Sequence, residues 1–210
     1  MKIVETQAIL VNPYKNFMSD KDHLICQLKN VELAGRNCYK SEEKITSDSY
    51  ISFVSALIKK KHLAMLEHGE ITFRFIVDRG VSHELVRHRM ASYAQESTRY
   101  CNYTSGKFHN QLTFIQPDFK NPECAIEWSS TMQFIEQAYF KLIAEFGAKP
   151  EMARSVLPSS LKTEVIMTAN LREWLHFIEL RTAHDAHPQI RKVAIQVKKI
   201  LEELAPCLFF

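Results

Sequence analysis

Glycine is scarce in this sequence, and the glycine-rich loops that commonly bind nucleotides are absent. Only five of the 210 residues are glycine, and neither a G-x-G-x-x-G run nor a G-x-x-x-x-G-K-[ST] run occurs. A bound phosphate would therefore have to be held by arginine side chains or by the N-terminus of a helix. The G-x-S-x-G run of serine hydrolases is absent as well, so Ser97 is better suited to a hydrogen bond than to nucleophilic attack.

Paired cysteines and long apolar runs are also missing. The five cysteines are far apart and form no C-x-x-C pair, which favours reduced thiols in a cytoplasmic protein over a disulfide framework or a zinc site. No run of about 18 apolar residues is present, and Glu5, Thr6 and Gln7 interrupt the apolar N-terminus. We therefore expect neither a signal peptide nor a membrane partner.

Charge of one sign is not in large excess. The chain has 27 basic and 24 acidic residues and a formal net charge of +3. Affinity for anions must then come from local clusters of charge, which disfavours a nucleic-acid partner. Hydrophobic residues make up 46% of the chain, enough for a sizeable core, and we interpret residues 1–210 as a single domain.

The spacing of apolar residues predicts both strands and helices. Strict alternation predicts strands over residues 70–78 and 162–169, and less regular patterns predict strands over 2–11 and 112–116. Helical spacing, caps and prolines predict helices over 21–35, 48–61, a short segment from Ser82, 122–147, a short segment from Pro150, 170–182, and from Pro188 onward.

Three details of these elements are specific enough to check. Gly35 is expected to end the first helix, because glycine favours the left-handed conformation that terminates helices. Ser82 is expected to cap a short helix that buries Met90, and an irregular loop is expected to follow.

The densest group of functional residue types lies between Ser82 and Tyr103. Arg87, Arg89 and Arg99 occur there among hydroxyl and aromatic side chains. Fixed cations beside hydroxyls and aromatic faces suit a phosphate-bearing aromatic ligand, so a nucleotide site is the first hypothesis. The residues alone leave two alternatives open, a solvated basic helix end and a loop that binds single-stranded nucleic acid.

A second group of candidates lies on the helix predicted after residue 170. Asn170 followed by Glu173 resembles a capping box that starts this helix. Arg172 and His176 are one turn apart on its polar face, whereas Arg181 lies on a largely apolar face. A buried arginine needs a partner, which can be a carboxylate or a ligand.

Cys101 and the histidine pairs are weaker candidates. Because Arg99 lies close to Cys101 in the sequence, nearby cations can lower the pKa of its thiol, but a passive thiol is the preferred interpretation. Two histidine pairs are better explained as ordinary polar residues, and we expect no metal site. These pairs are His62 with His68 and His184 with His187.

Several motifs together resemble the flavin-dependent thymidylate synthases. The run Arg87-His88-Arg89, followed after seven residues by Ser97 and then by Arg99-Tyr100, resembles the signature of that family. The resemblance continues, in the family's order, through residues 62–68, 152–158, 170–172, and Leu180-Arg181 followed by Ala186 and Ile190. The signature arginines are intact, which argues against a catalytically inactive homologue.

The resemblance implies a fold and a reaction. The fold would be α+β, with a mostly antiparallel, curved sheet flanked by helices. The reaction would be the reductive methylation of dUMP to dTMP, with 5,10-methylenetetrahydrofolate as carbon donor, FAD as hydride carrier and NADPH as reductant of the flavin. The family forms homotetramers with active sites between subunits. Its methylation is not thought to need an enzyme nucleophile, which favours the passive interpretation of Cys101.

The resemblance also implies roles for individual residues. Contacts with FAD would be made by His62, Glu67, Arg87, His88, Arg89, Gln95, Asn170, Leu171, Arg172 and His176. Contacts with dUMP would be made by Glu84, Leu85, Val86, Arg87, Gln95, Glu96, Ser97, Thr98, Arg99, Arg154 and Arg181. Arg181 would be the catalytic residue, because its charge can stabilise negative charge that develops on the uracil ring.

Five positions depart from the commonest pattern of the family. Ala94-Gln95 stands where many members have Asn-Glu, which replaces a charged acceptor by a neutral amide. Cys38, Ala64 and His176 stand where other members have Ser, Thr and Asn. These differences affect individual hydrogen bonds rather than the reaction.

Overall fold

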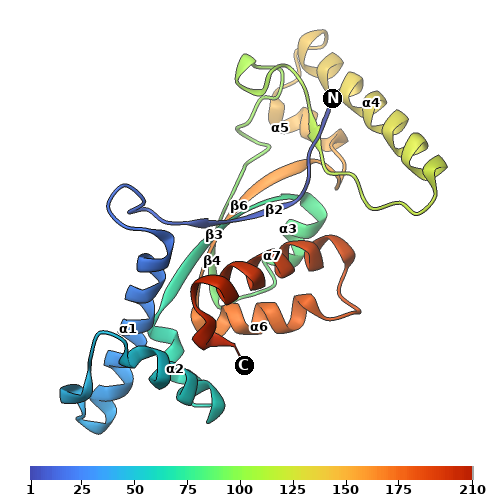
Figure 1. The fold of residues 1–210 in the computed structure, drawn as a ribbon. Coiled ribbons are helices and arrows are strands. Elements are labelled where there is room, and N and C mark those ends of the chain that lie inside the picture. Colours follow the sequence, from blue (N-terminus) through green and yellow to red (C-terminus); the bar gives the residue numbers. More distant parts are fainter. Residues whose placement is uncertain (210) are drawn as a thin grey trace. The chain divides into compact units, whose positions relative to one another are not determined.

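The computed structural model describes residues 1–209, and the chain divides into two compact units (Figure 1). Unit 1 consists of Met1–Gln7, Phe75–Arg87 and Ala94–Val165. Unit 2 consists of Ala8–Arg74, His88–Tyr93 and Ile166–Phe210. The chain passes from one unit to the other several times, so neither unit is a continuous stretch of sequence. The expectation of a single domain over residues 1–210 stays a prediction.

A four-stranded antiparallel sheet has the strand order β2-β3-β6-β4. Its strands are β2 (Gln7–Val11), β3 (Glu70–Asp78), β6 (Lys162–Asn170) and β4 (Ala91–Gln95). The strands predicted over 70–78 and 162–169 are confirmed, because alternate side chains of both are buried. The α+β class with an antiparallel sheet is likewise confirmed.

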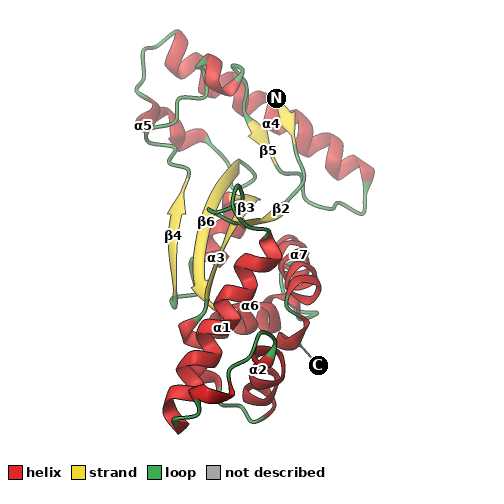
Figure 2. Ribbon diagram, turned by 60° about the vertical axis from the view of Figure 1, so that its left-hand side comes forward, coloured by secondary structure: helices red, strands yellow, loops and turns green. Residues whose placement is uncertain are grey.

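The helices of unit 2 are α1 (Asp20–Tyr39), α2 (Ser49–Lys59), α6 (Leu171–Thr182) and α7 (Pro188–Leu204). Short 3-10 turns cover Glu42–Lys44, Leu63–His68 and Pro206–Leu208. Helices α6 and α7 lie side by side, and α1 packs against α2 (Figures 1 and 2).

Helix α6 is fastened to the sheet by a tryptophan. The ring of Trp174 packs edge-on against Phe73 of β3 at a centroid distance of 4.9 Å. The indole Nε1 of Trp174 donates a hydrogen bond of 3.0 Å to the carbonyl oxygen of Ile71. Both side chains are fully buried, so the large apolar contact and the satisfied indole N–H together hold α6 in a fixed position against β3.

Unit 1 has its own small core. Its regular elements are β1 (Lys2–Ile3), α3 (Arg79–Leu85), β5 (Thr113–Phe114), α4 (Pro122–Ala144) and α5 (Pro150–Ala153), with 3-10 turns at Gly106–Phe108 and Arg154–Val156. Strands β1 and β5 pair in parallel. The core residues come from α4, α5 and the segments around β5, and they are Tyr103, Leu112, Phe114, Met132, Tyr139, Ala153 and Leu161.

The prediction of a single strand over residues 2–11 is wrong. The segment forms β1 and β2, which belong to different sheets. The break falls at Val4–Thr6, where Glu5 interrupts the apolar run. The strand predicted over 112–116 is shorter than expected and covers only Thr113–Phe114.

Gly35 does not end the first helix, as the sequence had suggested. It lies buried inside α1, and a Cβ built there would be 2.5 Å from Cε1 of Phe53 on α2. The glycine therefore permits close contact between two helices, and the left-handed position that ends α1 is taken by Lys40 instead.

The prediction for the segment after β3 is also wrong. Helix α3 starts earlier than expected, because Asp78 caps it by accepting a 2.7 Å hydrogen bond from the amide of Val81. Ser82 lies inside this helix, and Met90 is 67% exposed rather than buried. The expected irregular loop contains β4, whose pairing in the sheet the local pattern did not reveal.

The apolar side chains of two helices are only partly buried. On α2, Tyr50 and Leu57 are buried, whereas Ile51 is exposed. On α4, Met132 and Tyr139 are buried, whereas Phe146 lies beyond the end of the helix and is exposed. Among the described helices, none combines the length and apolarity that a membrane crossing requires.

The packing around Gly69 yields a stability prediction. A Cβ at this position would lie 2.8 Å from Cδ1 of Leu171 and 3.0 Å from the backbone oxygen of Gln27. We expect Gly69→Ala to lower the free energy of unfolding by about 1–3 kcal/mol, because the neighbouring backbone would have to shift. Urea unfolding of the full chain measures this change.

Gly106→Ala is the matched control. No atom lies within 4 Å of a Cβ built at Gly106, so the same substitution should change stability by less than about 0.5 kcal/mol. Equal stability of the two variants would contradict the packing described for Gly69.

Candidate active site

The N-terminus of α6 is the structural centre of the candidate site. Asn170 caps the helix, and its Oδ1 accepts a 2.9 Å hydrogen bond from the amide of Glu173. The amide of Leu171 donates a 2.8 Å hydrogen bond to the carbonyl of Gly69, which ends the 3-10 turn Leu63–His68. The turn and the first residues of α6 are thereby held next to each other.

Arg172 and Glu67 join the same two segments through their side chains. Nη1 of Arg172 donates to Oε1 of Glu67 at 2.7 Å, and both side chains are about half exposed. An exposed ion pair of this kind adds less than about 1 kcal/mol to stability. Its main effect is to orient the guanidinium group at the surface.

Three adjoining cavities surround these residues, all within unit 2. The first, of about 470 Å³, is lined by His62, Ala64, Cys38 and Arg172 among others. The second, of about 510 Å³, shares Leu63 and Arg172 with the first and includes Asn170 and His176. The third, of about 390 Å³, shares Glu67 and Asn170 with the second and includes Arg89. Each volume is in the range of small-molecule sites.

Most residues predicted to contact the cofactor lie around these cavities. His62, Glu67, Arg89, Asn170, Arg172 and His176 line at least one of them. Leu171 differs, because its side chain is fully buried and packs under Gly69. Arg87 and Gln95 belong to unit 1.

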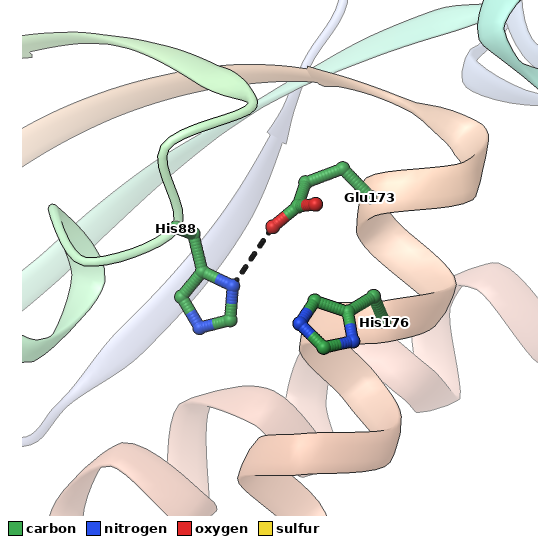
Figure 3. A group of neighbouring side chains, drawn as sticks. All are labelled: His88, Glu173 and His176. Atoms are coloured by element: carbon green, nitrogen blue, oxygen red, sulfur yellow. Dashed lines mark hydrogen bonds and ion pairs between the residues drawn. The ribbon is translucent and has the colours of Figure 1, made fainter.

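His88 is buried on one side of α6, beside the buried Glu173 and the exposed His176 (Figure 3). Its Nδ1 is 2.9 Å from Oε1 of Glu173, and its Nε2 is 3.1 Å from Nε of Arg181. The ring packs edge-on against Phe177 and against His176, at centroid distances of 5.1 and 5.8 Å. Arg181, expected on an apolar face, thus has a histidine as one of its partners.

The environment of His88 favours the neutral ring. Burial lowers the pKa of His88 below its ordinary value, and the nearby charge of Arg181 lowers it further. The hydrogen bond that His88 makes to the carboxylate of Glu173 raises the pKa without restoring the ordinary value. Tyr93 donates its hydroxyl proton to the carbonyl of His88 at 2.8 Å, and burial raises the pKa of that phenol.

The remaining predicted residues, apart from Arg181, lie in unit 1. Gln95 donates from Nε2 to Oγ of Ser82 at 2.9 Å and to Oγ1 of Thr163 at 3.2 Å. Glu96 accepts hydrogen bonds from the hydroxyl of Tyr103 at 2.8 Å and from Nζ of Lys162 at 3.0 Å. Both side chains therefore have fixed partners within the unit.

Two of the predicted phosphate-binding arginines lie near the same short helix. Nε of Arg99 is 3.6 Å from Oε2 of Glu151 on α5, and Arg154 begins the 3-10 turn that follows this helix. Both arginines are exposed. Ser97 accepts a 3.3 Å hydrogen bond from the amide of Arg99, so the hydroxyl and this arginine belong to one turn.

The residues predicted at the end of α3 differ in exposure. Val86 and Arg87 are exposed, and Glu84 is half-buried. The side chain of Leu85 is fully buried, and Thr98 is buried as well. A contact between Leu85 and a ligand would therefore have to involve its backbone.

The alternative in which nearby cations activate Cys101 is contradicted. Burial raises the pKa of its thiol, and the carboxylate of Glu96 raises it further. Lys107 and Lys162 act in the opposite direction but do not outweigh these effects. The passive interpretation of this cysteine is therefore favoured.

Sequence reasoning missed the role of the Glu173 side chain. Glu173 was recognised only as the fourth residue of a capping box, and its amide is capped as expected. Its carboxylate, however, reaches His88, which is 85 residues away in the sequence. Its position within the helix gave no sign of this contact, because the contact depends on how β4 and α6 are placed.

The structure and the comparisons agree on the kind of protein. The fold is α+β, and arginine and histidine side chains lie with the N-terminus of α6 around adjoining cavities. The family model described as "Thymidylate synthase complementing protein" matches residues 22–207. The chain belongs to this family, whose curated members include flavin-dependent thymidylate synthases.

Individual relatives are similar over most of their length. The flavin-dependent thymidylate synthase of Geobacter sulfurreducens is 34% identical over 186 residues, which covers 85% of this chain and 79% of that protein. Proteins of the same name from Mycobacterium sp. (strain JLS) and Mycobacterium avium are 31% and 30% identical, and each alignment covers 85% of this chain and 77% of the relative. The resemblance predicted from the motifs is confirmed.

The cysteines allow a test of the site that needs no substrate. Cys26, Cys38 and Cys124 are exposed, whereas Cys101 is partly buried and has a raised thiol pKa. We expect iodoacetamide at mildly alkaline pH to modify Cys101 several-fold more slowly than the three exposed cysteines. Peptide mass spectrometry of timed samples measures the four rates, and the urea-unfolded protein is the control. Fastest modification at Cys101 would contradict the assigned environment.

Proposed function

We propose that this protein is an FAD-dependent thymidylate synthase that reductively methylates dUMP to dTMP in nucleotide biosynthesis. The observation that carries this proposal is the convergence of His62, Glu67, Arg89, Asn170 and Arg172 on adjoining cavities at the start of α6. These residues come from distant parts of the sequence. Membership of the family and the names of the relatives point to the same activity.

The residues around the cavities fit a flavin cofactor. A diphosphate needs positive charge around it, which the side chains of Arg89 and Arg172 and the positive end of the α6 dipole would supply. The side chains of His62 and His176 offer planar rings beside the same cavities. Bound FAD would supply the hydride chemistry, which no amino-acid side chain provides.

The protein's own residues would bind and polarise the substrate. Arg99 and Arg154 are placed to pair with a phosphate, because both are exposed beside one short helix of unit 1. Ser97 would donate its hydroxyl proton to the same phosphate. Arg181 would stabilise negative charge on the uracil ring.

The two co-substrates, the assembly and the location complete the proposal. We propose 5,10-methylenetetrahydrofolate as carbon donor and NADPH as reductant, on the strength of the family relationship. A homotetramer with active sites between subunits is supported by Ile126 and Phe134 of α4, which are 70% and 71% exposed. A cytoplasmic location is supported by five cysteines that are all free.

The departures from the family pattern fall at identifiable places. Gln95 keeps two hydrogen bonds that an amide N–H can make and a carboxylate cannot. Cys38 and Ala64 line the first cavity, and His176 lines the second. We propose that these positions tune contacts with the cofactor without changing the reaction.

The first test is the visible spectrum of the purified protein. We expect flavin absorbance, or its appearance when FAD is added, and bleaching of that absorbance by NADPH. Formation of dTMP should then require dUMP and methylenetetrahydrofolate together. A protein that binds no FAD in a titration would overturn the proposal.

Two arginine variants separate binding from chemistry. Arg172→Ala should weaken FAD binding by about tenfold or more, because a charge-assisted contact is lost. Arg181→Ala should keep bound flavin but lower the turnover of dUMP by about 10²–10³. Flavin content by absorbance and dTMP by chromatography measure both effects.

Lys199→Ala is the control for these two substitutions. Lys199 is an exposed cation on α7, away from the residues that line the cavities, and its removal should change neither quantity. Normal turnover in Arg181→Ala would refute the catalytic role assigned to that residue.

A further inference from the structure

His88 is held from several sides within unit 2. Glu173 and Arg181 face its two ring nitrogens, and His176 packs against its ring. Tyr93 fixes its backbone carbonyl, and Phe177 covers its ring. With 4% of its surface exposed, His88 has little contact with solvent. Its hydrogen bonds are therefore determined by these neighbours rather than by water.

The chemistry of the partners allows only one arrangement of protons. The Nε–H of an arginine can donate a hydrogen bond but cannot accept one, so Nε2 of His88 must accept from Arg181. The proton of the neutral ring then lies on Nδ1, which donates to the carboxylate of Glu173. A carboxylate accepts and does not donate, so the two contacts require the same tautomer.

We propose that Glu173 is a positioning residue for Arg181. By accepting the Nδ1 proton of His88, Glu173 keeps Nε2 as the acceptor that fixes the guanidinium of Arg181. This inference rests on the proposed function, because that function gives Arg181 its task at the uracil ring. Glu173 also lines the second cavity, so flavin content has to be measured beside turnover to separate this role from a direct contact with the cofactor.

The side chain of Glu173 is not needed for the helix cap. Asn170 supplies the capping oxygen, and only the backbone amide of Glu173 takes part. Replacing the carboxylate by an amide therefore leaves the start of α6 intact. This separation makes Glu173→Gln a clean test of the carboxylate.

A metal site is the other chemistry that these residues suggest. Ligand atoms of His88, Glu173 and His176 lie within 4.8 Å of one another. A metal ion needs an unprotonated ring nitrogen with a free lone pair. In His88, Nδ1 carries a proton that is hydrogen-bonded to Glu173, and the lone pair of Nε2 accepts a hydrogen bond from Arg181. The positive charge of Arg181 also repels a cation. The hydrogen-bonded arrangement therefore explains the contacts better.

The arrangement is sensitive to pH in a defined direction. Protonation of His88 would place an N–H on Nε2 opposite the N–H of Arg181, and the contact between them would break. Activity should therefore fall as the pH drops through the pKa of His88, which burial places below the ordinary histidine value. Glu173 and Arg181 shift this pKa in opposite directions, and His176 lowers it slightly.

Nitrogen-15 NMR of the full chain with labelled histidine tests the tautomer directly. The signals of His88 are those that disappear in His88→Gln. At neutral pH we expect a proton on Nδ1 and none on Nε2, and a mixture of tautomers in Glu173→Gln, because a glutamine amide can donate or accept. A proton on Nε2 in the wild type, or an unchanged tautomer in the variant, would overturn the inference. This measurement needs neither FAD nor activity.

The kinetic consequence is measured on the FAD-loaded enzyme. Glu173→Gln should lower kcat by about tenfold while flavin content stays the same, because the productive tautomer is no longer enforced. The acidic limb of the pH–activity profile of this variant should move to lower pH, because the carboxylate that raises the pKa of His88 is gone. Glu203→Gln, the same change at an exposed position of α7, should match the wild type in both respects.

A second variant distinguishes the positioning role from a general loss of structure. His88→Gln carries an amide oxygen that can accept from Arg181 and does not titrate, so the acidic limb due to His88 should vanish. Wild-type kcat and pH dependence in Glu173→Gln, or an acidic limb retained in His88→Gln, would overturn the positioning role. A wild type that makes no dTMP would overturn the proposed function instead, and the NMR result would still decide the tautomer.

Discussion

The attachment of α6 to β3 is the interaction on which the candidate site depends. Trp174 fills the space against Phe73 and uses its only polar atom on the carbonyl of Ile71. Once this side of the helix is fixed, the 3.6-residue period fixes the other sides as well. Arg172 and His176 must then face the cavities, and Glu173 must face His88. One buried aromatic contact thus determines the directions of several functional side chains.

The scarcity of glycine has a visible structural consequence. Without a glycine-rich loop, the groups proposed to bind an anion around the cavities are arginine side chains and the positive end of the α6 dipole. Long side chains need to be oriented, and Glu67 orients Arg172. Two of the five glycines instead permit close packing, since Gly35 and Gly69 both lie where a Cβ would collide with a neighbour. Their positions could not be inferred from helix-ending preferences alone.

Local patterns predicted the parts of the fold that depend on local physics. The alternation in β3 and β6 and the cap of Asn170 are set by neighbouring residues, and all three are confirmed. Wrong predictions arose where distant segments decide the outcome. Met90 is exposed although it continues an apolar spacing, because the chain leaves α3 and enters β4.

The same difference between local and tertiary signals applies to the predictions for the candidate site. Motifs selected Arg172 and Arg181, because their residue types are recognisable in sequence. The contact of Glu173 with His88 and the raised thiol pKa of Cys101 depend on tertiary burial, which no local pattern encodes. The alternative of a lowered thiol pKa at Cys101 rested on its sequence neighbours, whereas desolvation and a carboxylate control this pKa in the folded chain.

The two arginines of α6 are supported in physically different ways, and the difference matches the tasks proposed for them. The pair of Arg172 with Glu67 is half exposed, and such a pair is weak in water. Arg172 can therefore exchange its partner for an incoming anion at little cost. Arg181 is held through a buried imidazole, where few water molecules compete and a hydrogen bond is correspondingly stronger. The proposed task of Arg181 is to stabilise negative charge that develops at a fixed place. Its rigidity favours this task, because a preoriented guanidinium group needs no reorganisation during the reaction.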